Sequence, residues 1–354
     1  MKGVVLAGGK GSRLRPLTYT GAKQLVPIAN KPILFYVLEH LVKAGVRDIG
    51  VIVGETKDQV KTAVADGARF GARVTYLEQP APLGIAHAVG LAREFVGQDK
   101  FVVFLGDNFV LGGIDPFVEG FQSKAQHCQI LLHEVPNPQD FGVVALRDSR
   151  IVSIQEKPRD PPSNLAIVGI YMFDPAVFEA IDHIRPSARN ELEITDAIRY
   201  LIEHGYQVGY HVLTAPWIDT GKKDDILHAN RLVLQTLGPR NEGVMDSETK
   251  ITGTVIVERN ARVTKSVLHG PCIIGENAVV RDSYIGPYTS IYHDCRIEGS
   301  ELDYCIVLEH SCILNIPGRL AESLIGRYVE VSRTTTRPAA LKMVLGDHSN
   351  IGLM

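Results

Sequence analysis

A six-residue aliphatic repeat in the last third of the chain restricts its fold more than any other feature. Six Val or Ile residues follow one another at this interval: Val267, Ile273, Val279, Ile285, Ile291 and Ile297. The period fits neither an α-helix nor an alternating β-strand. It is typical of a hexapeptide β-helix, in which aliphatic side chains stack inward in columns. A sandwich of short antiparallel strands is the alternative, and six consecutive matches make it the minority interpretation.

The repeat has limits in the sequence. Asp303 stands where the next aliphatic residue is due, and related pieces return at Ile325-Gly326 and Val344-Leu345. Upstream, the run Gly-Pro-Arg-Asn-Glu-Gly at residues 238–243 has the composition of a linker. A chain of 354 residues is long enough for two domains. We therefore expect one domain over residues 1–238, a linker over 239–245 and a β-helix over 246–354.

The first 238 residues alternate strand and helix patterns. Apolar runs at 4–6, 49–53 and 101–105 are suited to buried parallel strands, with helical patterns between them. This βαβ series predicts a sheet with helices on both faces, and the runs 141–144 and 151–157 add antiparallel strands. Ligands of such sheets bind beyond the carboxyl ends of the strands.

A glycine-rich loop follows the first strand. Gly8, Gly9 and Gly11 leave backbone N–H groups open to a close ligand, and such loops usually hold phosphate. Arg13 adds a cationic fork that matches phosphate oxygens. The loop fits neither the dinucleotide fingerprint, whose last glycine would be Leu14, nor the P-loop, because Gly11 follows Lys10.

The longer pattern G-G-x-G-x-R-L-x-P-x-T, followed by K-x-x-x-P and K-P, is far more restrictive. It resembles the signature of the sugar-1-phosphate nucleotidylyltransferases. The run Lys-Gln-Leu-Val-Pro-Ile-Ala-Asn-Lys-Pro-Ile most resembles the glucose-1-phosphate thymidylyltransferases that carry a C-terminal extension. The resemblance spans essentially the whole chain. It implies a Rossmann-like mixed α/β sheet followed by a left-handed parallel β-helix.

The resemblance also implies which residues form the site. For catalysis these are Arg13 and Lys23. For the nucleotide they are Leu6, Gly8, Gly9, Gly11, Gln24, Gln79, Pro82 and Gly84, and for the sugar phosphate Asn108, Gly142, Glu156, Lys157 and Val168. For Mg²⁺ they are Asp107 and Asp219. The chain departs from the family at Phe141, where several relatives have Tyr, so a sugar contact through that hydroxyl is absent.

The implied reaction transfers a thymidylyl group from dTTP to glucose 1-phosphate and yields dTDP-glucose and pyrophosphate. A phosphate monoester has a second pKa near ~6, so the nucleophile is already anionic and needs no general base. The reaction does need positive charge around a crowded phosphorus. Arg13, Lys23, Lys157 and Mg²⁺ would supply it, which favours an in-line displacement over a covalent intermediate.

Two other functions are compatible with these residues. One is another sugar nucleotidylyltransferase, such as a UTP-dependent enzyme, with an acetyltransferase in the β-helix that uses His269, His293 or His310. The other is a catalytically silent regulatory subunit. Such a subunit is expected to lack Arg13, Lys23, Asp107 or Asp219, and all four are present.

Composition excludes several partners. A net charge of −3 gives no global attraction for nucleic acid or an anionic membrane. We see neither a signal-peptide pattern nor an apolar run of membrane-spanning length. Five cysteines without a C-x-x-C pair are expected to be reduced thiols of a cytoplasmic protein. The open edges at the end of a β-helix need cover by the N-terminal domain or by another subunit, so we expect a homo-oligomer.

Overall fold

The computed structural model describes residues 1–333, 343 and 346–352. These residues form two compact units. The first combines Met1–Lys10 with Ile33–Asp219, and the second combines Gly11–Pro32 with the described residues from Thr220 onward. The chain therefore passes from one unit to the other inside the glycine-rich loop. The domain boundaries expected at residues 238 and 245 stay a prediction.

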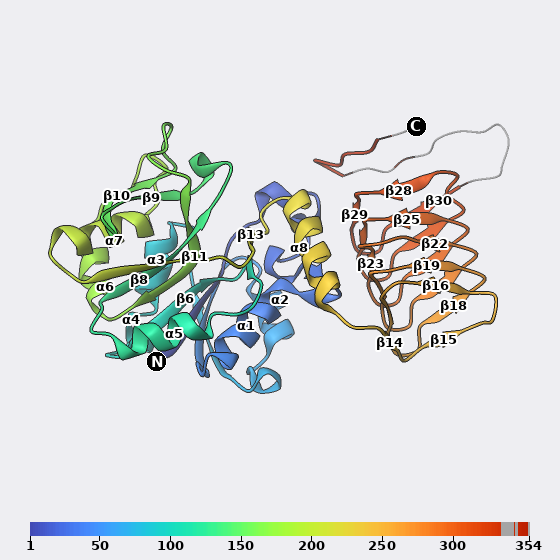
Figure 1. Cartoon of the computed structure of the whole chain (residues 1–354), viewed down its shortest axis with the longest axis horizontal. Helices are drawn as coiled ribbons and strands as arrows, with labels where there is room; N and C mark the ends of the chain where they lie inside the picture. Colours follow the sequence, from blue (N-terminus) through green and yellow to red (C-terminus); the bar gives the residue numbers. More distant parts are fainter. Residues whose placement is uncertain (334–342, 344–345, 353–354) are drawn as a thin grey trace. The chain divides into compact units, whose positions relative to one another are not determined.

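A mixed β-sheet forms the centre of the first unit (Figure 1). Its strand order is β10-β9-β11-β6-β1-β4-β5, with β8 paired to β11 and β12 to β8. The strands are β1 (Lys2–Ala7), β4 (Asp48–Val53), β5 (Arg73–Glu78), β6 (Phe101–Leu105), β8 (Cys128–Glu134), β9 (Gly142–Arg147), β10 (Arg150–Glu156), β11 (Leu165–Phe173) and β12 (Val208–Val212). Strands β5, β4, β1 and β6 are mutually parallel, whereas β11, β9 and β10 pair antiparallel. The expected α/β fold with a mixed sheet is confirmed.

Helices of the first unit follow the predicted alternation. They are α1 (Ile33–Lys43), α2 (Lys57–Val64), α3 (Ile85–Leu91), α4 (Arg93–Val96), α5 (Asp115–Ser123), α6 (Ala176–His183) and α7 (Ile194–Glu203). In α1 the buried positions Leu34, Val37, Leu38 and Leu41 recur at helical spacing, and the helix stops before Gly45, whose φ of +80° suits glycine. In the described part of the chain, every helix is too short or too polar to cross a membrane.

The second unit contains a parallel β-helix built from three sheets (Figure 1). The first sheet holds β14 (Arg240–Asn241), β17 (Val255–Val257), β20 (Cys272–Ile274), β23 (Ser290–Ile291), β26 (Ile306–Val307) and β29 (Leu324–Ile325). The second holds β15 (Val244–Met245), β18 (Arg262–Thr264), β21 (Val279–Arg281), β24 (Arg296–Glu298), β27 (Cys312–Leu314) and β30 (Glu330–Ser332). The third holds β16 (Lys250–Thr252), β19 (Val267–His269), β22 (Tyr284–Ile285), β25 (Glu301–Asp303) and β28 (Arg319–Ala321). This arrangement confirms the predicted β-helix.

The rung of this β-helix differs from three exact hexapeptides. Tyr284 lies 17 residues after its partner Val267, and Glu301 lies 17 residues after Tyr284. One of the three segments in each of these rungs is therefore one residue shorter than a hexapeptide. The inward-facing position moves by one residue at that segment. The inward residues are fully buried and come from successive strands of the three sheets: Leu268, Ile274, Val280, Ile285, Ile291 and Ile297.

The six-residue interpretation was therefore wrong for half of its positions. Val267, Ile273 and Val279 each precede an inward residue, and Val267 is 41% exposed. Successive residues of a strand point to opposite faces, so a shift of one residue exchanges core and surface. The prediction that Asp303 breaks the column was also wrong, because Leu302 beside it is inward and the core continues. Val344 and Leu345 lie outside the described residues.

A buried asparagine organises the rest of the second unit. Asn230 belongs to α8 (Lys223–Thr236) and is fully buried. Its Oδ1 accepts the N–H of Ala29 at 2.8 Å and the hydroxyl of Ser290 at 2.7 Å, and its Nδ2 donates to the Tyr288 carbonyl at 2.9 Å. Ala29 lies in the turn between β2 (Pro27–Ile28) and β3 (Lys31–Pro32). One side chain therefore joins this hairpin, α8 and the β-helix.

Replacing Asn230 by Leu is expected to lower the free energy of unfolding by about 3 kcal/mol. The change leaves buried donors and an acceptor unpaired, and each such group costs roughly 1–3 kcal/mol. Urea unfolding of the full chain measures the loss. Gln235→Leu, on the exposed end of α8, is the matched control and should change stability by less than about 0.5 kcal/mol. Equal midpoints for the two variants would contradict the role given to Asn230.

Candidate active site

The carboxyl ends of four parallel strands meet at one edge of the sheet. Ala7 pairs with Val53, Val53 with Glu78, and Leu6 with Leu105. The residues that follow these strands therefore lie along the same edge. Among them are three predicted site residues: Gly8, Gln79 and Asp107.

Gly8 and Gln79 are close neighbours at this edge. A Cβ on Gly8 would lie 3.2 Å from Oε1 of Gln79 and 3.3 Å from the backbone nitrogen of Gly54. The absence of a side chain at Gly8 thus lets two strand ends approach each other. Gly9, the next residue, is exposed and presents its backbone to solvent.

The segment from Gln79 to Gly84 forms a fixed loop. The side-chain amide of Gln79 donates to the Gly84 carbonyl at 3.4 Å and contacts Nδ1 of His87 at 3.1 Å. Gly84 has a φ of +104°, and a Cβ there would collide with the carbonyl oxygen of Leu192. Leu192 in turn donates its N–H to the Leu83 carbonyl at 2.8 Å. Pro82 is exposed at the tip of the loop.

The two predicted metal carboxylates lie at one end of a small pair of strands. β7 (Asn108–Val110) and β13 (Trp217–Asp219) run antiparallel, and Asn108 pairs directly with Asp219. Asp107 precedes Asn108 and is 7% exposed. Residues more than a hundred positions apart thus bring two carboxylates to the same end of this strand pair.

Asn108, one of the predicted sugar-phosphate residues, also stabilises this strand pair. Its Oδ1 accepts the indole N–H of Trp217 at 2.7 Å, and its Nδ2 donates to Oδ1 of Asp107 at 3.3 Å. The Trp217 ring also packs edge-on against Phe141, with the ring centroids 5.3 Å apart. Phe141 therefore has a packing role that needs no hydroxyl.

Gly142 and Glu156 are partners on the antiparallel strands β9 and β10. A Cβ on Gly142 would lie 2.7 Å from the Thr195 methyl group, so glycine is required for this close packing. Lys157 follows at the strand end, where it is exposed and its N–H donates to the Phe141 carbonyl at 3.0 Å. Val168 is buried in β11.

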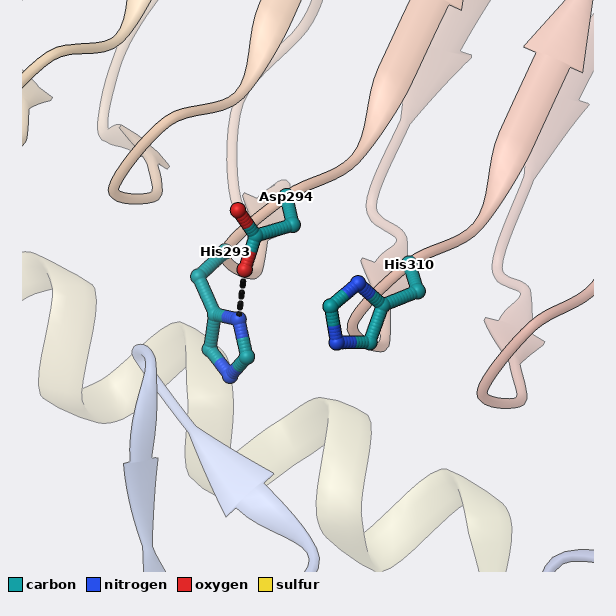
Figure 2. Close-up of side chains that lie close together, drawn as sticks. All are labelled: His293, Asp294 and His310. Carbon is teal, nitrogen blue, oxygen red and sulfur yellow. Dashed lines mark hydrogen bonds and ion pairs between the residues drawn. The ribbon is translucent and has the colours of Figure 1, made fainter.

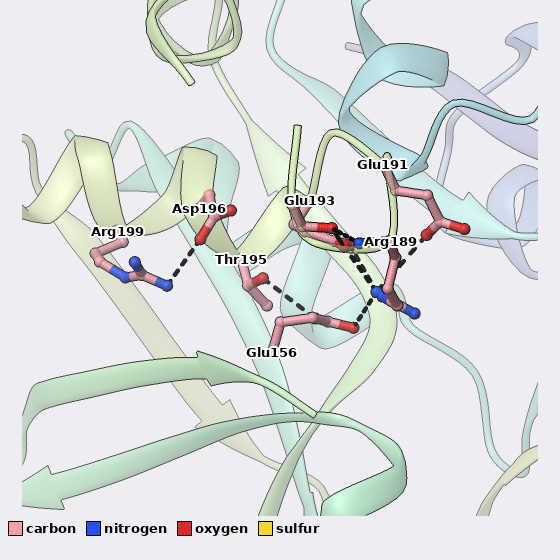
Figure 3. A network of polar contacts seen from close by, with 8 residues as sticks. Glu156, Arg189, Glu191, Glu193, Thr195, Asp196 and Arg199 are labelled. Atoms are coloured by element: carbon pink, nitrogen blue, oxygen red, sulfur yellow. Dashed lines mark hydrogen bonds and ion pairs between the residues drawn. The ribbon is translucent and has the colours of Figure 1, made fainter. Parts of the chain in front are cut away.

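An arginine that the sequence did not single out holds Glu156 in place (Figure 3). Arg189 donates to Oε1 of Glu156 at 3.0 Å and to both carboxylate oxygens of Glu193 at 2.8 and 2.9 Å. Thr195 donates to the other Glu156 oxygen at 3.1 Å. Burial and the charge of Glu193 raise the pKa of Glu156, and Arg189 partly opposes this shift.

A cleft of about 600 Å³ runs beside this network, which is within the usual range for small-molecule sites. Glu156, Lys157, Arg189 and Glu193 line it, whereas Gly142 and Val168 do not. Arg189 lies in an irregular segment with no local motif, so only the three-dimensional contacts reveal it.

Four more of the predicted residues belong to the second unit. Gly11 has a φ of +63°, and a Cβ there would lie 2.9 Å from both Cβ of Lys23 and Cγ2 of Thr18. Thr18 donates its hydroxyl to the Gly11 carbonyl at 2.6 Å. Lys23 is therefore held against the backbone of the glycine loop, at the start of a short 3-10 turn over Lys23–Leu25.

Arg13 and Gln24 have specific surroundings in the second unit. A Cβ on Gly221 would collide with the Arg13 guanidinium, so the glycine makes room for this side chain. Burial raises the pKa of Asp225, and the charges of Lys222 and Arg13 oppose the rise. Gln24 is 1% exposed, and its Oε1 accepts no hydrogen bond from the part of the chain that the structure describes. Such a buried acceptor is suited to a ligand donor.

Comparisons with known proteins show the family to which the chain belongs. The family model described as nucleotidyl transferase matches residues 2–236. A glucose-1-phosphate thymidylyltransferase of Streptomyces antibioticus is 50% identical over 99% of both chains, and one of Streptomyces griseus is 48% identical over 99% of this chain and 98% of its own. A Bacillus anthracis structure described as a glucose-1-phosphate thymidylyltransferase in complex with sucrose is 37% identical, covers 68% of this chain and 98% of its own, and superposes with a TM-score of 0.64. The chain thus belongs to the nucleotidyl transferase family.

Proposed function

We propose that this protein transfers a thymidylyl group from dTTP to glucose 1-phosphate, giving dTDP-glucose and pyrophosphate. One structural observation carries the proposal most directly: the β7–β13 pairing that brings Asp107 and Asp219 to one strand end. The full-length similarity to thymidylyltransferases supports the choice of substrates. A phosphate oxygen of the sugar phosphate attacks the α-phosphorus of dTTP. The bond between the α-phosphorus and the pyrophosphate oxygen breaks, and pyrophosphate leaves with the electrons of that bond.

The nucleotide is assigned to the loop that begins at Gly8 and to the segment Gln79–Gly84. Backbone N–H groups from Gly8, Gly9 and Gly11 would bind the triphosphate, with Leu6 beside them at the strand end. Arg13 and Lys23 would neutralise charge that develops during displacement. Gln79, Pro82, Gly84 and the buried Gln24 would contact the base and the deoxyribose.

The sugar phosphate is assigned to the residues around Glu156. Lys157, exposed at the end of β10, would contact the phosphate, whereas Glu156 would accept hydrogen bonds from sugar hydroxyls. Gly142, Val168 and Asn108 are also assigned to the sugar phosphate, and they lie outside the cleft that Glu156 and Lys157 line. Arg189 keeps the Glu156 carboxylate oriented, since it donates to that carboxylate directly.

Asp107 and Asp219 are suited to hold Mg²⁺. Two carboxylates together with substrate phosphates are the ligand set that Mg²⁺ prefers. When bound, the ion would offset the negative charge of the triphosphate. Two carboxylates alone leave the ligand set of Mg²⁺ incomplete, and substrate phosphates complete it, so binding of the cation should be weak without the nucleotide.

The alternatives differ in substrate or in activity. A UTP-dependent enzyme would use the same residues, and a silent regulatory subunit would retain only the fold. The decisive test is pyrophosphate release with Mg²⁺ across a grid of triphosphates and sugar 1-phosphates. We expect the highest kcat/KM for dTTP with glucose 1-phosphate. A preference for UTP or the absence of turnover would overturn the proposal. Acetyl transfer from acetyl-CoA to glucosamine 1-phosphate tests the β-helix alternative.

Replacing Gly84 by Ala is expected to lower kcat/KM for dTTP at least about tenfold. Alanine tolerates a φ near +104° poorly, and its methyl group would displace Leu192 and so the Gln79 loop. Gly120→Ala is the matched control, because no atom lies within 4 Å of a Cβ at that helical position. Wild-type kcat/KM in the Gly84 variant, with normal thermal unfolding, would contradict the role of this loop.

We also propose that the protein is a cytoplasmic homo-oligomer. Nucleoside triphosphates and sugar phosphates are substrates of that compartment. The five cysteines are free, and four of them are buried, as expected for reduced thiols. Light scattering of the purified chain tests the assembly, and a monomer at micromolar concentration would refute it.

A further inference from the structure

A second cluster of ligand-type side chains lies on the β-helix, apart from the residues assigned above. His293, Asp294 and His310 each offer one nitrogen or oxygen atom, and these atoms all lie within 4.8 Å of one another (Figure 2). Nδ1 of His293 lies 2.7 Å from Oδ2 of Asp294. The His310 ring stands edge-on to the His293 ring, with the centroids 5.5 Å apart.

The cluster arises from the stacking of turns in successive rungs. Residues at this corner adopt the left-handed backbone region: Asn260 (φ 61°), Asn277 (φ 60°), Asp294 (φ 58°), His310 (φ 60°) and Tyr328 (φ 55°). The N–H of His310 donates to the His293 carbonyl at 3.3 Å, which ties the two turns together. The imidazoles are thus brought together by the fold itself, although the residues are 17 positions apart.

The type of residue at this corner changes from one rung to the next. Asn260 donates to Asn277 at 3.2 Å, and Asn277 donates to Oδ1 of Asp294 at 3.0 Å. A ladder of amides at this corner is a structural feature that another Asn could extend. At Asp294 and His310, however, the ladder is replaced by a carboxylate and an imidazole, with a second imidazole next to them. Imidazole and carboxylate groups are usual ligands of zinc, whereas the side-chain amides before them are not.

We propose that His293, Asp294 and His310 bind one divalent transition-metal ion, with Zn²⁺ as the best match. Imidazole nitrogen and carboxylate oxygen are common zinc ligands, and three protein ligands leave a position open for water. The side chains of His293 and Asp294 are 35% and 36% exposed, so an ion can enter from solvent. The ion would crosslink two rungs and so stabilise the β-helix. This site is independent of the proposed Mg²⁺ carboxylates, which are oxygen ligands only.

Of the three histidines considered for acetyl transfer, His293 and His310 belong to the cluster. His269 is at the end of β19, in a different sheet of the β-helix, and is exposed. It does not belong to the cluster. His269 therefore serves as a matched control for the other two.

The test is calorimetric titration of the full chain, first stripped with a chelator and desalted, with ZnCl₂ alone. We expect one site per chain with micromolar or tighter affinity. His310→Asn should weaken binding at least tenfold, whereas His269→Ala should leave it unchanged. Asn is chosen because it occupies the same corner at residues 260 and 277 and tolerates the backbone conformation. Pyrophosphate release by the His310 variant reports that it is folded.

A second experiment tests whether the zinc binds at the proposed Mg²⁺ carboxylates instead of at the histidines. Excess MgCl₂ should not displace Zn²⁺, because imidazole ligands favour the transition metal. Asp294→Asn should weaken zinc binding as His310→Asn does and should leave the Mg²⁺ dependence of turnover unchanged. The proposal is overturned by equal zinc affinity in wild type and His310→Asn, by loss of binding in His269→Ala, or by displacement with Mg²⁺.

Discussion

Replacing Lys23 by Ala is expected to lower kcat by about 10²–10³, which is the typical cost of removing one preorganised charge donor. The Cβ of Lys23 lies against Gly11, whose missing side chain allows that contact, so the start of this side chain is fixed before substrate binds. Pyrophosphate release at saturating dTTP and glucose 1-phosphate measures the effect. Nucleotide binding by calorimetry should weaken much less, because the contribution is made mainly in the transition state.

Lys43→Ala is the matched control for this variant. Lys43 lies at the end of α1, is 63% exposed and pairs with Asp115 at 3.2 Å. Its loss should change kcat less than about twofold, as exposed ion pairs contribute little. Near-normal turnover in the Lys23 variant would show that Lys23 does not stabilise the transition state.

Replacing either Asp107 or Asp219 by Asn is expected to abolish measurable activity at low Mg²⁺, with a loss of at least about 10² in kcat. The substitution keeps the shape of each side chain and removes one negative charge at the end of the β7–β13 pair. The rate measured against Mg²⁺ concentration should show a raised half-saturation point. Asp224→Asn, with an 85% exposed side chain on α8, is the control. An unchanged Mg²⁺ dependence in both variants would rule out the assigned ligands.

Much of the first unit could be predicted from the sequence because its strands have unambiguous patterns. Phe101–Leu105 is an uninterrupted apolar run, as a strand covered on both faces must be. The β-helix was predictable as a class, but its register was not. Ile273-Ile274 and Val279-Val280 are aliphatic at both neighbouring positions, so spacing alone cannot decide which of each pair faces inward. Only the 17-residue pairing of the rungs resolves it.

The candidate site shows the same division between local and long-range information. A glycine loop and an Asp after a strand are local signals, and the structure brings Gly8, Gln79 and Asp107 to one sheet edge. The contact of Gly84 with Leu192, and that of Arg189 with Glu156, join segments whose sequences carry no mutual signal. Such contacts arise from tertiary packing. The spacing of residues in a single sequence does not predict them.

The connection of the Pro27–Pro32 hairpin to the β-helix has a consequence during synthesis. Asn30 donates to the carbonyl of Ile291, 261 residues further along the chain, and the hairpin also depends on Asn230 and Ser290. At roughly 5–20 residues per second, a ribosome needs about 15–50 s to make that intervening length. For that interval a nascent chain has its hairpin but lacks the partners of Ala29 and Asn30. The hairpin of a newly made N-terminal portion should therefore stay open to proteases until the β-helix emerges.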